Sequence, residues 1–201
     1  MTEPATPGFR LLPQYLSTQA QADLLGEVQS RIALAPLYTP ITPGGKAMSV
    51  AMTNFGPLGW VTDAAGYRYQ STHPVTAHPW PDIPQSLLDL WSALCTPDAA
   101  PDACLVNLYG PAAKMGLHQD KDESDFAFPV LSVSLGDHAL FRLGGARRTD
   151  PTASFRLSSG DVCILQGPGR LAYHGIDHII PGSSRLIPGG GRINLTLRRA
   201  A

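Results

Sequence analysis

The second half of the chain is a succession of short apolar segments separated by turns, and this pattern restricts the possible folds most strongly. Strands are predicted at residues 131–135, 139–143, 154–157, 162–165, 171–174 and 192–198. The chain also contains 20 glycines and 19 prolines, which favour turns over long helices. Many short strands with turns between them are typical of a β-sandwich or a β-barrel.

Helical periodicity is confined to two segments in the first half of the chain. One helix is expected to begin near Ser17 or Thr18, because Thr18 and Gln21 have the spacing of a capping box. A second helix is expected to follow Pro84, with its apolar residues on one face. We expect both helices to pack on the sheet.

The region between the helices, residues 36–80, is irregular and rich in Pro, Gly, Met and aromatic residues. Short strands or hairpins are expected around 49–53 and 67–70. A long irregular region in a compact domain is often a binding loop or a lid.

The length of 201 residues predicts one domain, residues 1–201. Within it we expect a loose tail at 1–8, a lid region at 36–80 and a β catalytic core at 103–199. The fold class is therefore α+β, mainly β, with flanking N-terminal helices.

Bulk properties exclude some classes of protein. The net charge of −1 does not indicate nucleic-acid binding. The three cysteines form no C-x-x-C pair, so reduced thiols in the cytoplasm are expected rather than disulfides or a zinc site. Neither a signal peptide nor an apolar run of membrane-spanning length is recognised.

The chemistry is expected around an H-x-D motif at His118 and Asp120. In an extended segment these two side chains point the same way, and a second imidazole follows at His174. Two histidines and one carboxylate leave open positions on an octahedral metal, which suits oxygen-activating non-haem iron(II). The motif alone is weak, because taken by itself it favours a surface histidine near an acid.

The segment from Arg192 to Arg198 alternates polar and apolar residues. Periodicity leaves two interpretations open. It could be an edge strand with a solvated polar face. It could also be the cationic wall of a barrel, where paired arginines bind a dicarboxylic acid and where Asn107 and Tyr109 add neutral donors.

Together these motifs resemble the AlkB family of Fe(II)- and 2-oxoglutarate-dependent nucleic-acid repair dioxygenases. The resemblance covers roughly residues 36–199. The matching segments are Asn107–Pro111, Lys114–Glu123, Val133–Gly136, Gly144–Gly145 with Arg148–Pro151, Tyr173–Gly175 and Arg192–Arg198. Met48–Asn54 and Gly56–Trp60 resemble the family's nucleotide-recognition lid.

The resemblance implies a double-stranded β-helix, or jelly-roll, with iron(II) held by His118, Asp120 and His174. It implies that Arg198 pairs with the far carboxylate of 2-oxoglutarate and that Arg192 lies near its metal-chelating end. Further co-substrate contacts are implied for Asn107, Tyr109 and Asn194. Ile193 and Arg142 depart from the family's usual residues, but neither matches a catalytic position.

The implied reaction is oxidative demethylation of bases such as 1-methyladenine and 3-methylcytosine, with O2 as the second co-substrate. Trp60 and His118 would enclose the damaged base, while Tyr67, Asp122 and Arg148 match positions near the nucleotide. The expected partner is alkylated single-stranded DNA, with double-stranded DNA and RNA as further substrates; no membrane is involved, and the enzyme is expected to be a monomer. Backbone contacts would come from Lys114, Lys121, Arg147 and Arg148.

Two other functions remain open from the sequence. A 2-oxoglutarate hydroxylase acting on a protein or a small molecule would keep the iron site and use the lid differently. A non-catalytic nucleic-acid binding module is the third hypothesis, although it gives no reason for the complete ligand set.

Overall fold

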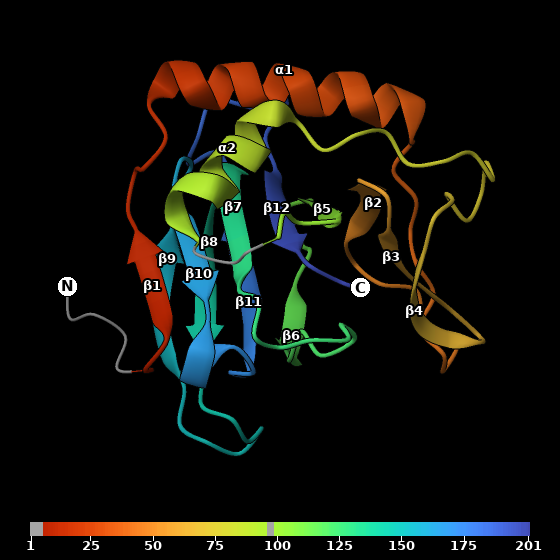
Figure 1. Ribbon diagram of the computed structural model, residues 1–201. Helices are drawn as coiled ribbons and strands as arrows, with labels where there is room; N and C mark the ends of the chain where they lie inside the picture. The colour runs from red at the N-terminus through yellow and green to blue at the C-terminus, as the bar shows by residue number, and fades with distance from the viewer. Residues whose placement is uncertain (1–5, 96–98) are drawn as a thin grey trace.

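The computed structural model describes residues 6–95 and 99–201 and has a mainly β fold with two long helices (Figure 1). A six-stranded sheet has the order β1 (Phe9–Leu12), β10 (Val162–Leu165), β7 (Val130–Gly136), β12 (Arg192–Arg198), β5 (Ala103–Tyr109) and β2 (Ala51–Phe55). A four-stranded sheet has the order β6 (Met115–His118), β11 (His174–Ile180), β8 (His138–Leu143) and β9 (Ala153–Leu157). All neighbouring strands are antiparallel. The two sheets form a jelly-roll core, so the predicted fold class is confirmed.

The helices α1 (Thr18–Leu34) and α2 (Gln85–Leu94) lie together along one side of the strands (Figure 1). The start of α1 was predicted correctly, but its cap differs. The Ser17 hydroxyl accepts a hydrogen bond from the Ala20 N–H at 3.2 Å, and Gln21 donates to the Leu16 carbonyl instead of completing a capping box. Ser17 therefore takes the role expected of Thr18.

Apolar side chains fill two layers, one on each face of the six-stranded sheet. The outer layer joins Leu24 and Val28 of α1 and Trp91 of α2 to the sheet. The inner layer lies between the two sheets and includes Leu105 and Phe141. Because both faces of this sheet are covered, its central strands are almost completely buried.

The strand β12 pairs with β7 on one side and β5 on the other, over nearly its whole length. It is therefore a central strand, and the interpretation as an edge strand with a solvated face is wrong. Ile193, Leu195 and Leu197 belong to the layer beneath the helices. The alternate side chains line a cavity between the sheets, namely Arg192, Asn194, Thr196 and Arg198.

The predicted strand at 171–174 is wrong except for its last residue. Residues 171–173 follow a short 3-10 helix, Gly167–Gly169, and the Ala172 N–H donates to the Gly169 carbonyl. The strand instead begins at His174 and continues to Ile180. Apolar character misled the prediction because a buried turn and a buried strand have similar compositions.

The predicted lid region, 36–80, divides between two structures. Ala51–Phe55 forms β2 of the six-stranded sheet, whereas β3 (Gly59–Asp63) and β4 (Gly66–Gln70) form a separate hairpin. This hairpin lies on the side of the molecule away from β1 (Figure 1). We call β3 and β4 the lid hairpin.

Residues 1–5 of the predicted loose tail lie outside the described residues. Within the same tail, the Gly8 carbonyl accepts a hydrogen bond from the Gln166 N–H, directly before β1. Among the described residues, no helix has the length and apolar character needed to cross a membrane.

Candidate active site

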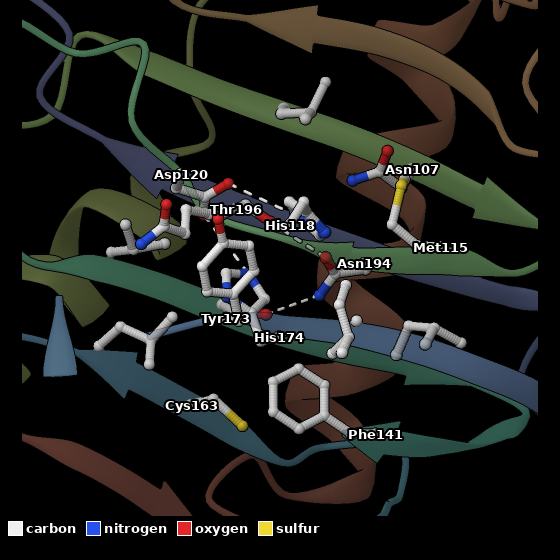
Figure 2. A pocket seen from close by; sticks show the side chains of 18 of the residues that line it. Asn107, Met115, His118, Asp120, Phe141, Cys163, Tyr173, His174, Asn194 and Thr196 are labelled. Carbon is white, nitrogen blue, oxygen red and sulfur yellow. Dashed lines mark hydrogen bonds and ion pairs between the residues drawn. The ribbon is translucent and has the colours of Figure 1, made fainter. Parts of the chain in front are cut away.

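A cavity of ≈ 410 Å³ lies between the two sheets and extends to the lid hairpin. Polar side chains line it from β5, β6, β11 and β12, and the sulfur and aromatic groups of Cys163 and Phe141 line it from β10 and β8 (Figure 2). All twelve predicted site residues line this cavity: Asn107, Tyr109, His118, Asp120, Asp122, Arg148, His174, Arg192, Asn194 and Arg198, with Trp60 and Tyr67 of the lid hairpin.

His118, Asp120 and His174 direct their side chains toward one another at the end of this cavity (Figure 2). Their candidate ligand atoms all lie within 4.8 Å of one another. His118 Nε2 is 3.8 Å from Asp120 Oδ1, and His174 Nε2 is 3.7 Å from Asp120 Oδ2. Two imidazoles and one carboxylate in this arrangement could hold a divalent metal.

Strand pairing brings the two histidines together. His118 ends β6, His174 begins β11, and the two residues are direct cross-strand partners. Asp120 lies two residues beyond the end of β6, so the H-x-D motif is not contained in one strand, and the three side chains nevertheless converge.

Backbone carbonyls orient both imidazole rings. His118 Nδ1 lies 2.9 Å from the Gly116 carbonyl, and His174 Nδ1 lies 2.9 Å from the Ala172 carbonyl. When each Nδ1 carries the proton and donates it to its carbonyl, each Nε2 presents a lone pair. This tautomer turns both lone pairs toward Asp120.

The electrostatic environment keeps the cluster ready for a cation. Burial and the neighbouring His118 ring lower the pKa of His174 from 6.5 to about 4. Burial opposes ionisation of Asp120, but Arg198 and the two histidines outweigh it and hold the pKa of this carboxyl below its ordinary value. Asp120 is therefore ionised and His174 neutral at pH 7.

The two arginines of β12 both line the cavity but lie at different distances from the metal cluster. Arg198 Nη2 lies 2.8 Å from Asp120 Oδ1, so this guanidinium is at the metal end. Arg192 lies six residues away on the same strand, beside Ser134 and near Tyr109 and Cys163. The resemblance implied that Arg198 meets the far carboxylate of 2-oxoglutarate, whereas the structure places Arg198 beside Asp120 and Arg192 farther along β12.

Arg192 is almost fully buried, at 1% exposure, and its hydrogen bonds are incomplete. Its Nη2 donates to the Ser134 hydroxyl at 2.9 Å, while Nε and Nη1 have no partner among the described residues. The two unpaired guanidinium nitrogens are buried donors, which are costly without an acceptor, so the Arg192 end of the cavity has the chemistry of an anion site. The buried Asn107 Oδ1, which lies opposite Asn194, is an acceptor without a partner among the described residues.

Asn194 is already engaged. Its amide donates to the Ser132 hydroxyl at 2.7 Å and to the Val133 carbonyl at 3.1 Å, and its Oδ1 accepts from Thr196 at 3.0 Å. Burial raises the pKa of the Tyr109 hydroxyl to about 12, against the opposing charge of Arg192, so the hydroxyl stays protonated. Asn194 and Tyr109 thus present fixed, neutral groups along the wall.

The lid hairpin supplies an aromatic pair at the mouth of the cavity. Trp60 and Tyr67 stack with ring centroids 5.6 Å apart and an angle of 19° between their planes. The Trp60 indole N–H donates to Asp122 Oδ2 at 2.7 Å. Arg148 is tied to the same rim, because its Nη1 donates to the Leu117 carbonyl at 2.6 Å.

Three residues that were not predicted from the sequence complete the site. Glu123 is buried beside the metal cluster and contacts Arg170, Arg198 and Tyr69. Glu123 belongs to the acidic run that follows His118, and this run could have indicated from the sequence that Glu123 lies near the site. Arg170 and Tyr69 are far from that run in the sequence, and only the fold brings them to it.

Comparison with known proteins agrees with this geometry. The model of the 2OG-Fe(II) oxygenase superfamily matches residues 8–198. The alpha-ketoglutarate-dependent dioxygenase AlkB homolog of Caulobacter vibrioides is 60% identical, over 96% of this chain and 88% of that protein. The alpha-ketoglutarate-dependent dioxygenase AlkB of Escherichia coli is 44% identical, over 98% of this chain and 93% of that protein.

A solved structure is similar over the same extent. The structure of OsALKBH1 superposes with a TM-score of 0.79 at 33% identity, covering 96% of this chain and 98% of that one. Three findings agree on one family. The family model matches nearly the whole chain, a relative is 60% identical, and a His-Asp-His cluster lies in an arginine-lined cavity. The chain belongs to the AlkB family of Fe(II)- and 2-oxoglutarate-dependent dioxygenases.

Proposed function

We propose that this enzyme removes N-alkyl groups from nucleic-acid bases by oxidative demethylation, using O2 and 2-oxoglutarate. The observation that carries the proposal is the combination of three features in one cavity. These are a His-Asp-His cluster, a buried guanidinium with unused donors, and an aromatic pair at the mouth. Each corresponds to one requirement of the reaction: metal, co-substrate and base.

His118, Asp120 and His174 would hold Fe(II), because the donor set and the mutual approach of their ligand atoms fit this metal. When bound, the iron supplies the oxidation of an N-methyl group, with 2-oxoglutarate converted to succinate and CO2 and the methyl carbon released as formaldehyde. The protein orients the three ligands, buries Asp120 and His174 and keeps His174 neutral.

Arg192 would bind the distal carboxylate of 2-oxoglutarate. Its Nε and Nη1 have no other partner among the described residues, and a carboxylate can accept two guanidinium hydrogen bonds at once. Arg198 would neutralise charge at the metal end, next to Asp120. Asn107, Tyr109 and Asn194 line the wall between these two ends and would contact the co-substrate.

Trp60 and His118 would enclose the target base, with Tyr67 stacked behind Trp60. Bases such as 1-methyladenine and 3-methylcytosine are cationic, and an aromatic face attracts a cation by about 0.5–2 kcal/mol. Asp122 adds a negative charge at the same place and fixes the indole by accepting its N–H.

The target base must leave a duplex or already be single-stranded to reach the cavity, and flipping costs a few kcal/mol. We therefore infer that alkylated single-stranded DNA is the main substrate and that double-stranded DNA and RNA are further substrates.

Basic side chains near the cavity would bind the nucleic-acid backbone. Lys114, Lys121, Arg147 and Arg148, all exposed, would contact the phosphates.

Within a single domain, we assign the role of a lid to residues 36–80 and the catalytic role to residues 103–199. We further infer that the protein is a cytoplasmic monomer, in which the free, buried Cys95, Cys104 and Cys163 stay reduced.

The test is formaldehyde release from a short oligonucleotide that carries 1-methyladenine or 3-methylcytosine, with Fe(II), 2-oxoglutarate and O2 present. The expected result is turnover that His174→Ala abolishes. His178→Ala is the matched control, because His178 lies on the same strand, is exposed and does not belong to the cluster. Consumption of 2-oxoglutarate without formaldehyde from any methylated oligonucleotide would contradict the proposal and favour a hydroxylase of a protein or small molecule.

A further inference from the structure

Glu123 is the centre of a buried charged network beside the metal cluster. Its side chain is 1% exposed. Glu123 Oε2 lies 3.2 Å from Arg170 Nη2, and Oε1 lies 3.3 Å from Arg198 Nε. A carboxylate between two buried guanidinium groups is compensated; Glu123 accepts a hydrogen bond from Arg170 and forms an ion pair with Arg198.

Both arginines also hold Asp120, but by different atoms. Arg198 Nη2 lies 2.8 Å from the Asp120 carboxylate, whereas Arg170 Nη1 donates to the Asp120 backbone carbonyl at 2.7 Å. A further bond, from Arg170 Nε to the Phe128 carbonyl at 2.8 Å, anchors the loop that follows. Asp120 is therefore located by two guanidinium groups, and Glu123 connects those two groups.

The lid hairpin reaches the same network through Tyr69. The Tyr69 hydroxyl donates to Glu123 Oε1 at 2.7 Å and accepts from Arg198 Nη1 at 3.4 Å. Tyr69 is the direct cross-strand partner of Trp60, whose indole donates to Asp122. The cross-strand pair of the lid hairpin thus contacts two consecutive acids, Trp60 through Asp122 and Tyr69 through Glu123. Both acids lie within three residues of Asp120 in the sequence.

We propose that Tyr69 and Glu123 are positioning residues that connect the lid hairpin to the metal end of the cavity, so that occupation of that end and the position of Trp60 depend on each other. This coupling rests on the proposed function of the site. Arg198 is shared among Asp120, Glu123 and Tyr69. A ligand that binds the Arg198 guanidinium therefore changes the contacts available to Tyr69. Because Tyr69 is paired with Trp60 in the hairpin, the position of Trp60 changes as well.

The experiment measures backbone hydrogen exchange of residues 59–70 in three states: metal-free, with Mn(II) alone, and with Mn(II) and 2-oxoglutarate. In the wild-type protein, the two additions are expected to change the exchange rate of the hairpin. Tyr69→Phe keeps the ring and removes the hydroxyl, so the metal-free hairpin should exchange roughly tenfold faster, since a hydrogen bond to a charged group is lost. Its response to Mn(II) and 2-oxoglutarate should also disappear.

Tyr38→Phe is the matched control. Tyr38 packs against His73 at the base of the lid region, but its buried hydroxyl has no partner among the described residues. Its removal should leave both the exchange rate of the hairpin and its response to ligands unchanged. Equal behaviour of Tyr69→Phe and Tyr38→Phe would overturn the proposal.

Glu123→Gln gives a second, independent readout if it folds, because it keeps the shape and removes the charge between Arg170 and Arg198. It should raise KM for the methylated oligonucleotide more than it lowers kcat, and it should speed exchange in the hairpin as Tyr69→Phe does. An unchanged hairpin in Glu123→Gln would contradict the coupling. Failure of wild-type protein to bind Mn(II) would contradict the proposed function, but it would leave the metal-free comparison of Tyr69→Phe and Tyr38→Phe as a separate test.

Discussion

Arg198 and Asp120 form a buried ion pair, with 2.8 Å between Nη2 and Oδ1, directly at the metal cluster. Asp120 alone would be a costly buried charge, and burial does oppose its ionisation. Arg198 therefore maintains the anionic form of a carboxylate that a metal requires.

Removal of Arg198 should destabilise the protein strongly. Arg198→Gln leaves Asp120 and Glu123 without their shared cation, and breaking a buried pair costs about 3–5 kcal/mol. Urea denaturation of the metal-free protein measures the change in unfolding free energy. Arg199→Gln is the control, because Arg199 is the next residue, is partly exposed and pairs with Asp102 at 3.6 Å. Asp102 keeps its hydrogen bonds from the Ala200 and Ala201 N–H groups when Arg199 is replaced, so the loss should be only about 1 kcal/mol, and an equal loss in both variants would contradict this role of Arg198.

Removal of Arg192 should have the opposite effect on stability. Arg192 is buried with two unpaired nitrogens, so Arg192→Met should leave the unfolding free energy unchanged or raise it by about 1–4 kcal/mol. The affinity of the Mn(II) form for 2-oxoglutarate, measured by calorimetric titration, should fall by about 2–5 kcal/mol. Arg156→Met, at an exposed position of β9, should change neither quantity. Loss of stability without loss of 2-oxoglutarate affinity would show that Arg192 is structural.

The sequence predicted the parts of this fold in which local pattern and final environment agree. The alternation from Arg192 to Arg198 specified both faces of β12, and the structure has the same strand limits. The alternation could not distinguish an edge strand from a central one, because neighbours in a sheet depend on β5 and β7, which are far away in the sequence. The same limit explains why the sequence did not show which of Arg192 and Arg198 lies beside Asp120.

Long-range contacts account for the residues that the sequence did not reveal. Arg170 follows a Gly-Pro-Gly turn and resembles any surface arginine in the sequence, yet it is 2% exposed and holds Asp120 and Glu123. Tyr69 is likewise indistinguishable in the sequence from an ordinary tyrosine of a hairpin. Its role depends on how the lid hairpin is positioned over the core, which no local periodicity encodes.

Stability of the metal-free protein should depend on pH through His174. Its pKa is about 4 in the fold and close to 6.5 in an unfolded chain, so the unfolded state binds more protons between these values. Stability therefore decreases as the pH falls from about 6.5 to 4, by up to about 1.4 kcal/mol per pH unit. Urea midpoints across this range should show a shallower slope for His174→Gln than for the wild type. Equal slopes would mean that His174 does not titrate in this way.

Asp122 should discriminate cationic from neutral damaged bases. Asp122→Asn retains an oxygen that can accept the Trp60 indole N–H, now 2.7 Å from Oδ2, but it removes the negative charge. KM for an oligonucleotide with 1-methyladenine should rise roughly five- to tenfold, as expected for an exposed charge that contributes about 1 kcal/mol. KM for one with the neutral base 3-methylthymine should change little. Asp122→Ala removes the acceptor as well, so it should raise both KM values and alter Trp60 fluorescence. An equal rise for both bases in Asp122→Asn would show that Asp122 acts only through Trp60 and not through its charge.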